Sequence, residues 1–133
     1  TSFVPEPSCP QILFVDSPDF AARTQRPIEG AGYRVFWCAT AKEGLCLMER
    51  EKIDLIILDL VLVVGEISGY EMCLRIKQDS RLKSIPMILL CDPRIPVEIG
   101  MDYRLELEAS TLLVKPVDTD RLCLEIKSLL TSS

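Results

Sequence analysis

The sequence contains no histidine and no Cys-x-x-Cys pair, although six of its 133 residues are cysteines. Without histidine, the chain cannot carry Ser-His-Asp or Cys-His catalysis, an HExxH zinc site or an imidazole pH switch. Zinc fingers and thioredoxin-type redox sites are also unsupported, because both need close cysteine spacing. We therefore expect cysteines that are reduced and mostly buried, which favours a cytoplasmic location.

A long apolar run and an excess of positive charge are missing too. The most apolar run, around residues 60–64, is far shorter than the ~20 residues of a membrane span. The formal net charge of −5 argues against nucleic acid or an anionic membrane as a direct partner. The length predicts one domain. We place it at residues 11–131, after a flexible N-terminal arm at residues 1–10.

Short continuous apolar runs alternate along the chain with segments of helical periodicity. The runs predict strands at residues 12–15, 33–38, 55–58, 87–90 and 112–114. Such runs are typical of strands that are buried on both faces of a parallel sheet. Helix-start signals follow several of them, such as Pro18 after Ser17 and the capping box from Thr40 to Glu43. Residues 97–109 have no clear amphipathic stripe. The pattern predicts an α/β fold with one doubly wound, five-stranded parallel sheet and helices on both faces.

Polar side chains end four of the predicted strands, namely Asp16, Asp59, Cys91 and Lys115. In an open α/β sheet, ligands bind beyond the carboxyl ends of the strands, where the strand order reverses. Two carboxylates at this edge attract a cation, and carboxylate and water oxygens suit Mg²⁺. An ionised aspartate beside a hard cation can attack phosphorus, and a neighbouring lysine can balance the charge of the phosphoryl group.

Four segments in this order and spacing resemble the receiver domain of two-component response regulators. They are residues 12–16, 54–60, 85–90 and 114–117. The resemblance covers about residues 10–131 and implies a flavodoxin-like fold with strand order 2-1-3-4-5. It implies a signalling module rather than an enzyme. Its partners would be a histidine kinase or small phosphodonor and a downstream protein or fused output domain.

The resemblance also assigns roles to individual residues. Asp59 corresponds to the phosphoacceptor, and Lys115 corresponds to its salt-bridge partner, with a cis bond to Pro116. Mg²⁺ would be held by Asp59, by Asp16 and by the backbone carbonyl of Val61. By the same comparison, output would pass through the fourth helix, the fifth strand and the fifth helix.

Several positions depart from the family pattern. Ser17 replaces the second acid that usually follows the first strand, which should weaken Mg²⁺ binding. Cys91 replaces the threonine or serine of the switch position, and a thiol is a weaker hydrogen-bond donor. Leu112 replaces the switch aromatic residue, and the loop after Asp59 is about two residues longer than usual. The chain is therefore interpreted as an atypical receiver.

Other interpretations remain beside this one. The Gly69-Tyr70 loop, the short turn after Cys91 and the weakly periodic fourth helix are similar to the pseudo-receiver of a bacterial social-motility regulator. A phosphorylation-independent scaffold for protein interaction is the main alternative. Asp16 could also act mainly as a helix cap. A flavin-binding protein would need a phosphate-binding loop after the first strand, and residues 17–20 do not form one.

Overall fold

In the computed structural model of the chain, the residues described are 9–60 and 67–131. Within them, five strands alternate with five helices: β1 (Gln11–Val15), α1 (Pro18–Gly30), β2 (Arg34–Cys38), α2 (Ala41–Arg50), β3 (Leu55–Asp59), α3 (Gly69–Gln78), β4 (Met87–Cys91), α4 (Val97–Glu106), β5 (Thr111–Val114) and α5 (Thr119–Thr131). The strands form one parallel sheet in the order β2-β1-β3-β4-β5. The predicted fold and strand order are confirmed.

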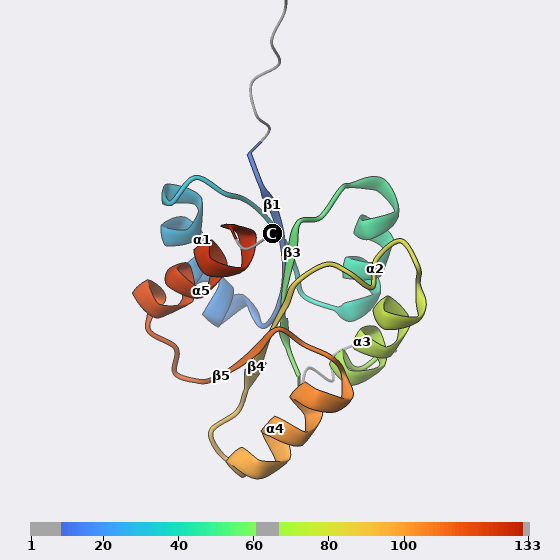
Figure 1. Ribbon diagram of the computed structural model, residues 1–133. Coiled ribbons are helices and arrows are strands. Elements are labelled where there is room, and N and C mark those ends of the chain that lie inside the picture. The colour runs from blue at the N-terminus through green and yellow to red at the C-terminus, as the bar shows by residue number, and fades with distance from the viewer. Residues whose placement is uncertain (1–8, 61–66, 132–133) are drawn as a thin grey trace, which may run out of the picture.

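Helices cover both faces of the sheet, as expected. Figure 1 shows α1 and α5 on one side of the sheet and α2 and α3 on the other, with α4 beside β5 at the bottom of the view. Successive residues of β1 contribute to opposite cores because strand side chains alternate between the two faces. Phe14 packs in the core with α1 and α5, whereas Leu13 and Val15 pack in the core with α2 and α3.

The first turns of the helices follow the predicted signals. α1 begins at Pro18 with Ser17 as its N-cap residue, and α2 begins after Thr40. The Thr40 hydroxyl oxygen accepts a hydrogen bond from the backbone N–H of Glu43 at 3.2 Å, as a capping box requires. Ser17 makes no side-chain cap bond, and it lines the cavity described below.

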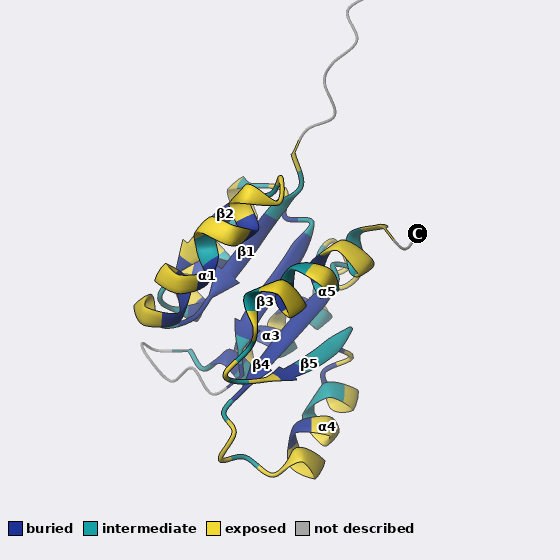
Figure 2. Ribbon diagram, turned by 90° about the vertical axis from the view of Figure 1, so that its left-hand side faces the viewer, coloured by how far each residue is buried: buried dark blue, intermediate teal, exposed yellow. Residues whose placement is uncertain are grey.

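Helix α4 forms although its sequence shows no amphipathic stripe. The only one of its residues that is fully buried is Gly100. A Cβ atom at Gly100 would lie 3.0 Å from Cδ2 of Leu112 and 3.6 Å from Sγ of Cys91. The helix therefore packs through a glycine rather than through a row of apolar side chains. Figure 2 shows the central strands buried and the outer surface of α4 largely exposed.

The parallel arrangement brings the carboxyl ends of all five strands to one edge. The strand order reverses between β1 and β3, which is where an α/β sheet of this kind binds its ligands. None of the helices formed by residues 9–60 and 67–131 combines the length and hydropathy that a membrane crossing requires.

Candidate functional site

The structure brings three of the predicted site residues into direct contact. Asp16 follows β1, Asp59 ends β3, and Lys115 follows β5. The ammonium nitrogen of Lys115 lies 2.9 Å from Oδ1 of Asp16 and 3.0 Å from Oδ2 of Asp59. The peptide bond between Lys115 and Pro116 is cis, as the resemblance implied. One ammonium group thus joins two carboxylates at the point where the strand order reverses.

Asp16 is the more deeply buried of the two carboxylates. Its side chain is 0% exposed, and Oδ1 accepts a hydrogen bond from the backbone N–H of Ser17 at 2.6 Å. Burial raises the pKa of Asp16 despite its bonds to Lys115 and Ser17. Oδ2 of Asp16 is buried and has no hydrogen-bond partner within the described part of the chain. The indole N–H of Trp37 donates to the backbone carbonyl of Asp16 at 3.0 Å, which anchors this segment to β2.

Lys115 compensates half of the negative charge that the two carboxylates bring to this crevice. Burial alone would lower the pKa of its ammonium group, but the bonds to Asp16 and Asp59 outweigh burial and raise the pKa. With both carboxylates ionised, two negative charges and one positive charge leave a net charge of −1. Asp59 is more accessible than Asp16, with 15% of its side chain exposed. The accessible carboxylate of the pair is therefore the one at the end of β3.

Cys91 lies at the same edge but outside this ion-pair cluster. It ends β4, is 2% exposed, and places Sγ 3.6 Å from the backbone carbonyl of Asp92. Burial, followed by the charges of Asp59 and Asp92, raises the pKa of the Cys91 thiol. A thiol that is harder to ionise is a poor nucleophile. The end of β4 thus carries a buried thiol, which is a weak hydrogen-bond donor and packs near Gly100 of α4.

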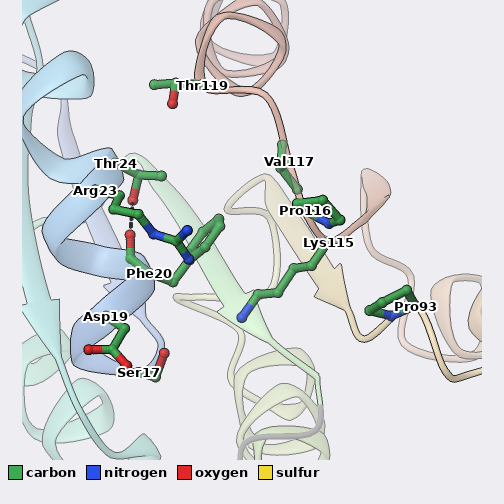
Figure 3. A pocket seen from close by; sticks show the side chains of 10 residues that line it. All are labelled: Ser17, Asp19, Phe20, Arg23, Thr24, Pro93, Lys115, Pro116, Val117 and Thr119. Atoms are coloured by element: carbon green, nitrogen blue, oxygen red, sulfur yellow. Dashed lines mark hydrogen bonds between the residues drawn. The ribbon is translucent and has the colours of Figure 1, made fainter.

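A cavity of about 410 Å³ opens on the α1 side of Lys115. Figure 3 shows its lining, with Ser17, Asp19 and Arg23 on one side and residues of the β5–α5 connection on the other. Sequence reasoning missed the contact of Phe20, whose ring centroid lies 4.6 Å from the Lys115 ammonium nitrogen. No local sequence signal connects a helix residue with a lysine at the end of a distant strand.

The donor set partly fits a divalent cation. Asp16 and Asp59 supply carboxylate oxygens, which Mg²⁺ prefers. The unsatisfied Oδ2 of Asp16 is the kind of buried acceptor that a cation or a bound water satisfies. Across residues 9–60 and 67–131, however, no group of three or more acidic, histidine or cysteine side chains could hold a metal. The third predicted ligand, the carbonyl of Val61, lies outside the described residues.

Comparisons with known proteins agree with this geometry. Residues 12–127 match the response regulator receiver domain family. The two-component response regulator ORR3 from Oryza sativa is 33% identical over 92% of this chain and 94% of its own length.

Solved structures show the same likeness. The signal receiver domain of a signal transduction histidine kinase from Syntrophus aciditrophicus has a TM-score of 0.80 and is 30% identical, covering 92% of this chain and 90% of that one. The receiver domain of the sensor histidine kinase PA1611 from Pseudomonas aeruginosa, solved with magnesium coordinated in its active-site cleft, has a TM-score of 0.79. It is 21% identical and covers 94% of this chain and all of that one, so it supports the fold alone. With its sheet order, its paired strand-end aspartates and these matches, the chain belongs to the receiver domain family of response regulators.

Proposed function

We propose that the chain is an atypical receiver that accepts a phosphoryl group on Asp59 and signals through protein contacts. The observation that supports this most directly is the 3.0 Å contact between Nζ of Lys115 and Oδ2 of Asp59. Asp59 is the accessible carboxylate of the cluster, whereas Asp16 is fully buried. A nucleophile must be reached by its donor, so Asp59 is the better acceptor.

The transfer forms one bond and breaks another. A carboxylate oxygen of Asp59 attacks the phosphorus of a histidine kinase phosphohistidine or of a small acyl phosphate. The new O–P bond forms as the P–N or P–O bond to the donor breaks, and the electron pair leaves with the imidazole or the carboxylate. Mg²⁺, held by Asp16, Asp59 and the Val61 carbonyl, would offset repulsion between the anions. Lys115 balances the charge on the phosphoryl oxygens.

Three residues near the site make the response to phosphorylation weaker than in a usual receiver. Ser17 offers a hydroxyl in place of a carboxylate, which lowers the negative charge available to Mg²⁺. Cys91 offers a weak donor to the phosphoryl group. Leu112 packs close to Gly100, so that the switch position holds an aliphatic side chain against α4. The site can therefore bind and react while passing little of the change to α4.

The proposed output surface lies on α4, β5 and α5. On α4 the side chains of Val97, Ile99, Met101 and Leu105 are exposed, and Leu105 is 66% exposed. Apolar side chains gathered on one helix suit contact with a downstream protein or a fused output domain. With the net charge of −5, this surface favours a protein partner over nucleic acid.

The second candidate function is a phosphorylation-independent scaffold. The same replacements at Ser17, Cys91 and Leu112 favour it, and it corresponds to the resemblance to the social-motility pseudo-receiver. In this case the α4 surface would bind its partner constitutively. Phosphorylation of Asp59 would then be absent or without effect on α4.

Incubation with acetyl phosphate and millimolar Mg²⁺ tests the proposal, with the intact mass of the protein as the readout. We expect one added phosphoryl group in the wild-type chain and none in Asp59→Asn. Asp19→Asn is the matched control, because Asp19 lines the neighbouring cavity without contacting Lys115 in the described structure. This variant should accept the phosphoryl group like the wild type. Equal labelling of Asp59→Asn and the wild type would refute Asp59 as the acceptor.

Amide NMR spectra with Mg²⁺ and beryllofluoride separate the two candidate functions. Shifts that start at Asp59 and reach α4 and α5, and that vanish in Asp59→Asn, indicate a working phospho-switch. Shifts confined to the crevice indicate a site that binds without signalling. The absence of any shift at millimolar Mg²⁺ supports the scaffold.

A further inference from the structure

The ammonium group of Lys115 has an aromatic neighbour in addition to its two carboxylate partners. Its nitrogen lies 4.6 Å from the centroid of the Phe20 ring. Figure 3 shows the Lys115 side chain extending from the β5–α5 connection toward Phe20 and the first turn of α1. A cation over an aromatic face is attracted by the negative face of the ring, and the attraction increases when water is excluded.

Phe20 is itself held firmly. It is 6% exposed, and its ring packs edge-on against Phe14 of β1, with ring centroids 5.8 Å apart. The hydroxyl of Thr24 donates to the backbone carbonyl of Phe20 at 2.8 Å within α1. The ring is therefore a fixed surface, whereas a lysine side chain has several rotatable bonds and loses considerable entropy when it is held in one place.

The cavity beside Lys115 offers the ammonium group another position. Asp19 lines this cavity, and its side chain is exposed. Arg23 also lines the cavity, and its guanidinium carbon lies 6.0 Å from the Phe20 ring centroid. The positive charge of Arg23 repels a second cation, such as the Lys115 ammonium group. The ring attracts the ammonium on the crevice side while the guanidinium charge opposes its entry into the cavity. Together they favour the position between Asp16 and Asp59.

We propose that Phe20 is a positioning residue that holds the Lys115 ammonium group beside Asp59. The part of this inference that concerns rate rests on the proposed function, because Lys115 must be in place when charge develops on the phosphoryl oxygens. Phe20 does not touch the reacting atoms. It acts through Lys115, by limiting the time that the ammonium spends away from the crevice.

The rate of phosphorylation by acetyl phosphate tests this role. Phe20→Leu should react about threefold to tenfold more slowly than the wild type, the size expected from one cation–π contact. Phe20→Tyr keeps the aromatic face and should retain most of the rate. Phe36→Leu is the matched control, since it removes a ring that contacts Arg34 at 4.8 Å on β2 and should leave the rate unchanged.

A second measurement follows Lys115 without any phosphodonor. A nearby ring face shifts the NMR signals of the lysine ε-methylene group upfield. We expect this shift in the wild type and Phe20→Tyr, and its loss in Phe20→Leu, while core methyl signals show that each variant is folded. If Phe20→Leu acted only by loosening the fold, Phe20→Tyr would not restore the upfield shift of the Lys115 signals.

The outcomes separate the inference from the proposed function. If the wild-type chain is not phosphorylated, the proposed function fails, and the Lys115 signals alone decide whether Phe20 positions the ammonium. If the wild type reacts and Phe20→Leu reacts equally fast, the positioning role is wrong. It is also wrong if Phe20→Tyr is as slow as Phe20→Leu, or if the Lys115 signals are the same in all variants.

Discussion

Gly69, the first residue of α3, lies directly against the backbone of Asp59. A Cβ atom at position 69 would come within 2.6 Å of the Asp59 carbonyl oxygen and 3.0 Å of the Leu60 carbonyl oxygen. The neighbouring backbone carries a hydrogen bond from the N–H of Leu60 to the carbonyl of Leu90, so it cannot move away without disturbing β4. The start of α3 is thus packed against the strand end that presents the candidate phosphoacceptor.

We expect Gly69→Ala to destabilise the protein by about 1–3 kcal/mol, the usual cost of inserting a methyl group into a packed region. Gly30→Ala is the control, since a Cβ at the end of α1 would meet nothing within 4 Å. It should raise stability by about 0.5–1 kcal/mol, because alanine favours the helix. Denaturant unfolding measures both. Equal effects of the two variants would contradict the close packing at Asp59.

The main elements and the centre of the site could be predicted because each depends on local pattern and on one topological rule. Apolar runs identified the strands, and parallel strands bring Asp16, Asp59 and Lys115 to one edge. Helix α4 was not clear from its sequence because it packs through Gly100, which leaves no stripe of apolar residues. The contact of Phe20 with Lys115 depends on how α1 is placed relative to the end of β5, and no sequence spacing encodes that.

Restoring an acid at position 17 should strengthen Mg²⁺ binding. Ser17→Asp adds a carboxylate next to Asp16, and aspartate serves as well as serine as an N-cap for α1. We expect the affinity to rise by about tenfold or more, because a further unit charge near a divalent ion contributes several kcal/mol before desolvation. Trp37 is the single tryptophan and contacts the Asp16 carbonyl, so its fluorescence can follow the titration.

Ser17→Asn is the control for this titration. Asparagine has nearly the same size as aspartate but carries no negative charge. An equal gain in Mg²⁺ affinity for Ser17→Asn and Ser17→Asp would show that charge is not the cause.

The contact between α3 and α4 should have its own pH dependence. The hydroxyl of Tyr70 donates to Oε1 of Glu106, and its ring packs edge-on against Tyr103 at 5.8 Å. The bond to Glu106 raises the pKa of Tyr70 above its ordinary value of 10.0. Only the neutral phenol can donate this bond. Its contribution to stability is therefore fully present below pH 10 and is lost as the pH rises through the higher pKa of the folded state.

A titration followed by phenolate absorbance checks this expectation. One of the three tyrosines should ionise at a higher pH than an ordinary tyrosine, and Tyr70→Phe should remove this high-pH phase of the titration. Glu106→Gln should bring the phase back toward pH 10, because an amide accepts the bond without the carboxylate charge. Identical titrations of the wild type and Glu106→Gln would rule out the Tyr70–Glu106 bond in solution.

The altered switch position offers the most direct test of signal transmission. Cys91 lies buried between the crevice and α4, where a Cβ at Gly100 would approach its sulfur to 3.6 Å. A threonine hydroxyl can donate a stronger hydrogen bond than a thiol to an oxygen or fluorine atom bound at Asp59. In Cys91→Thr, beryllofluoride should therefore produce amide shifts in α4 that are larger than those of the wild type. Cys91→Val has the shape of threonine but no hydroxyl, so it should show no such gain. If valine and threonine enlarge the α4 shifts equally, the change comes from packing against Gly100 and Leu112, and the missing donor does not explain the proposed weak response of α4.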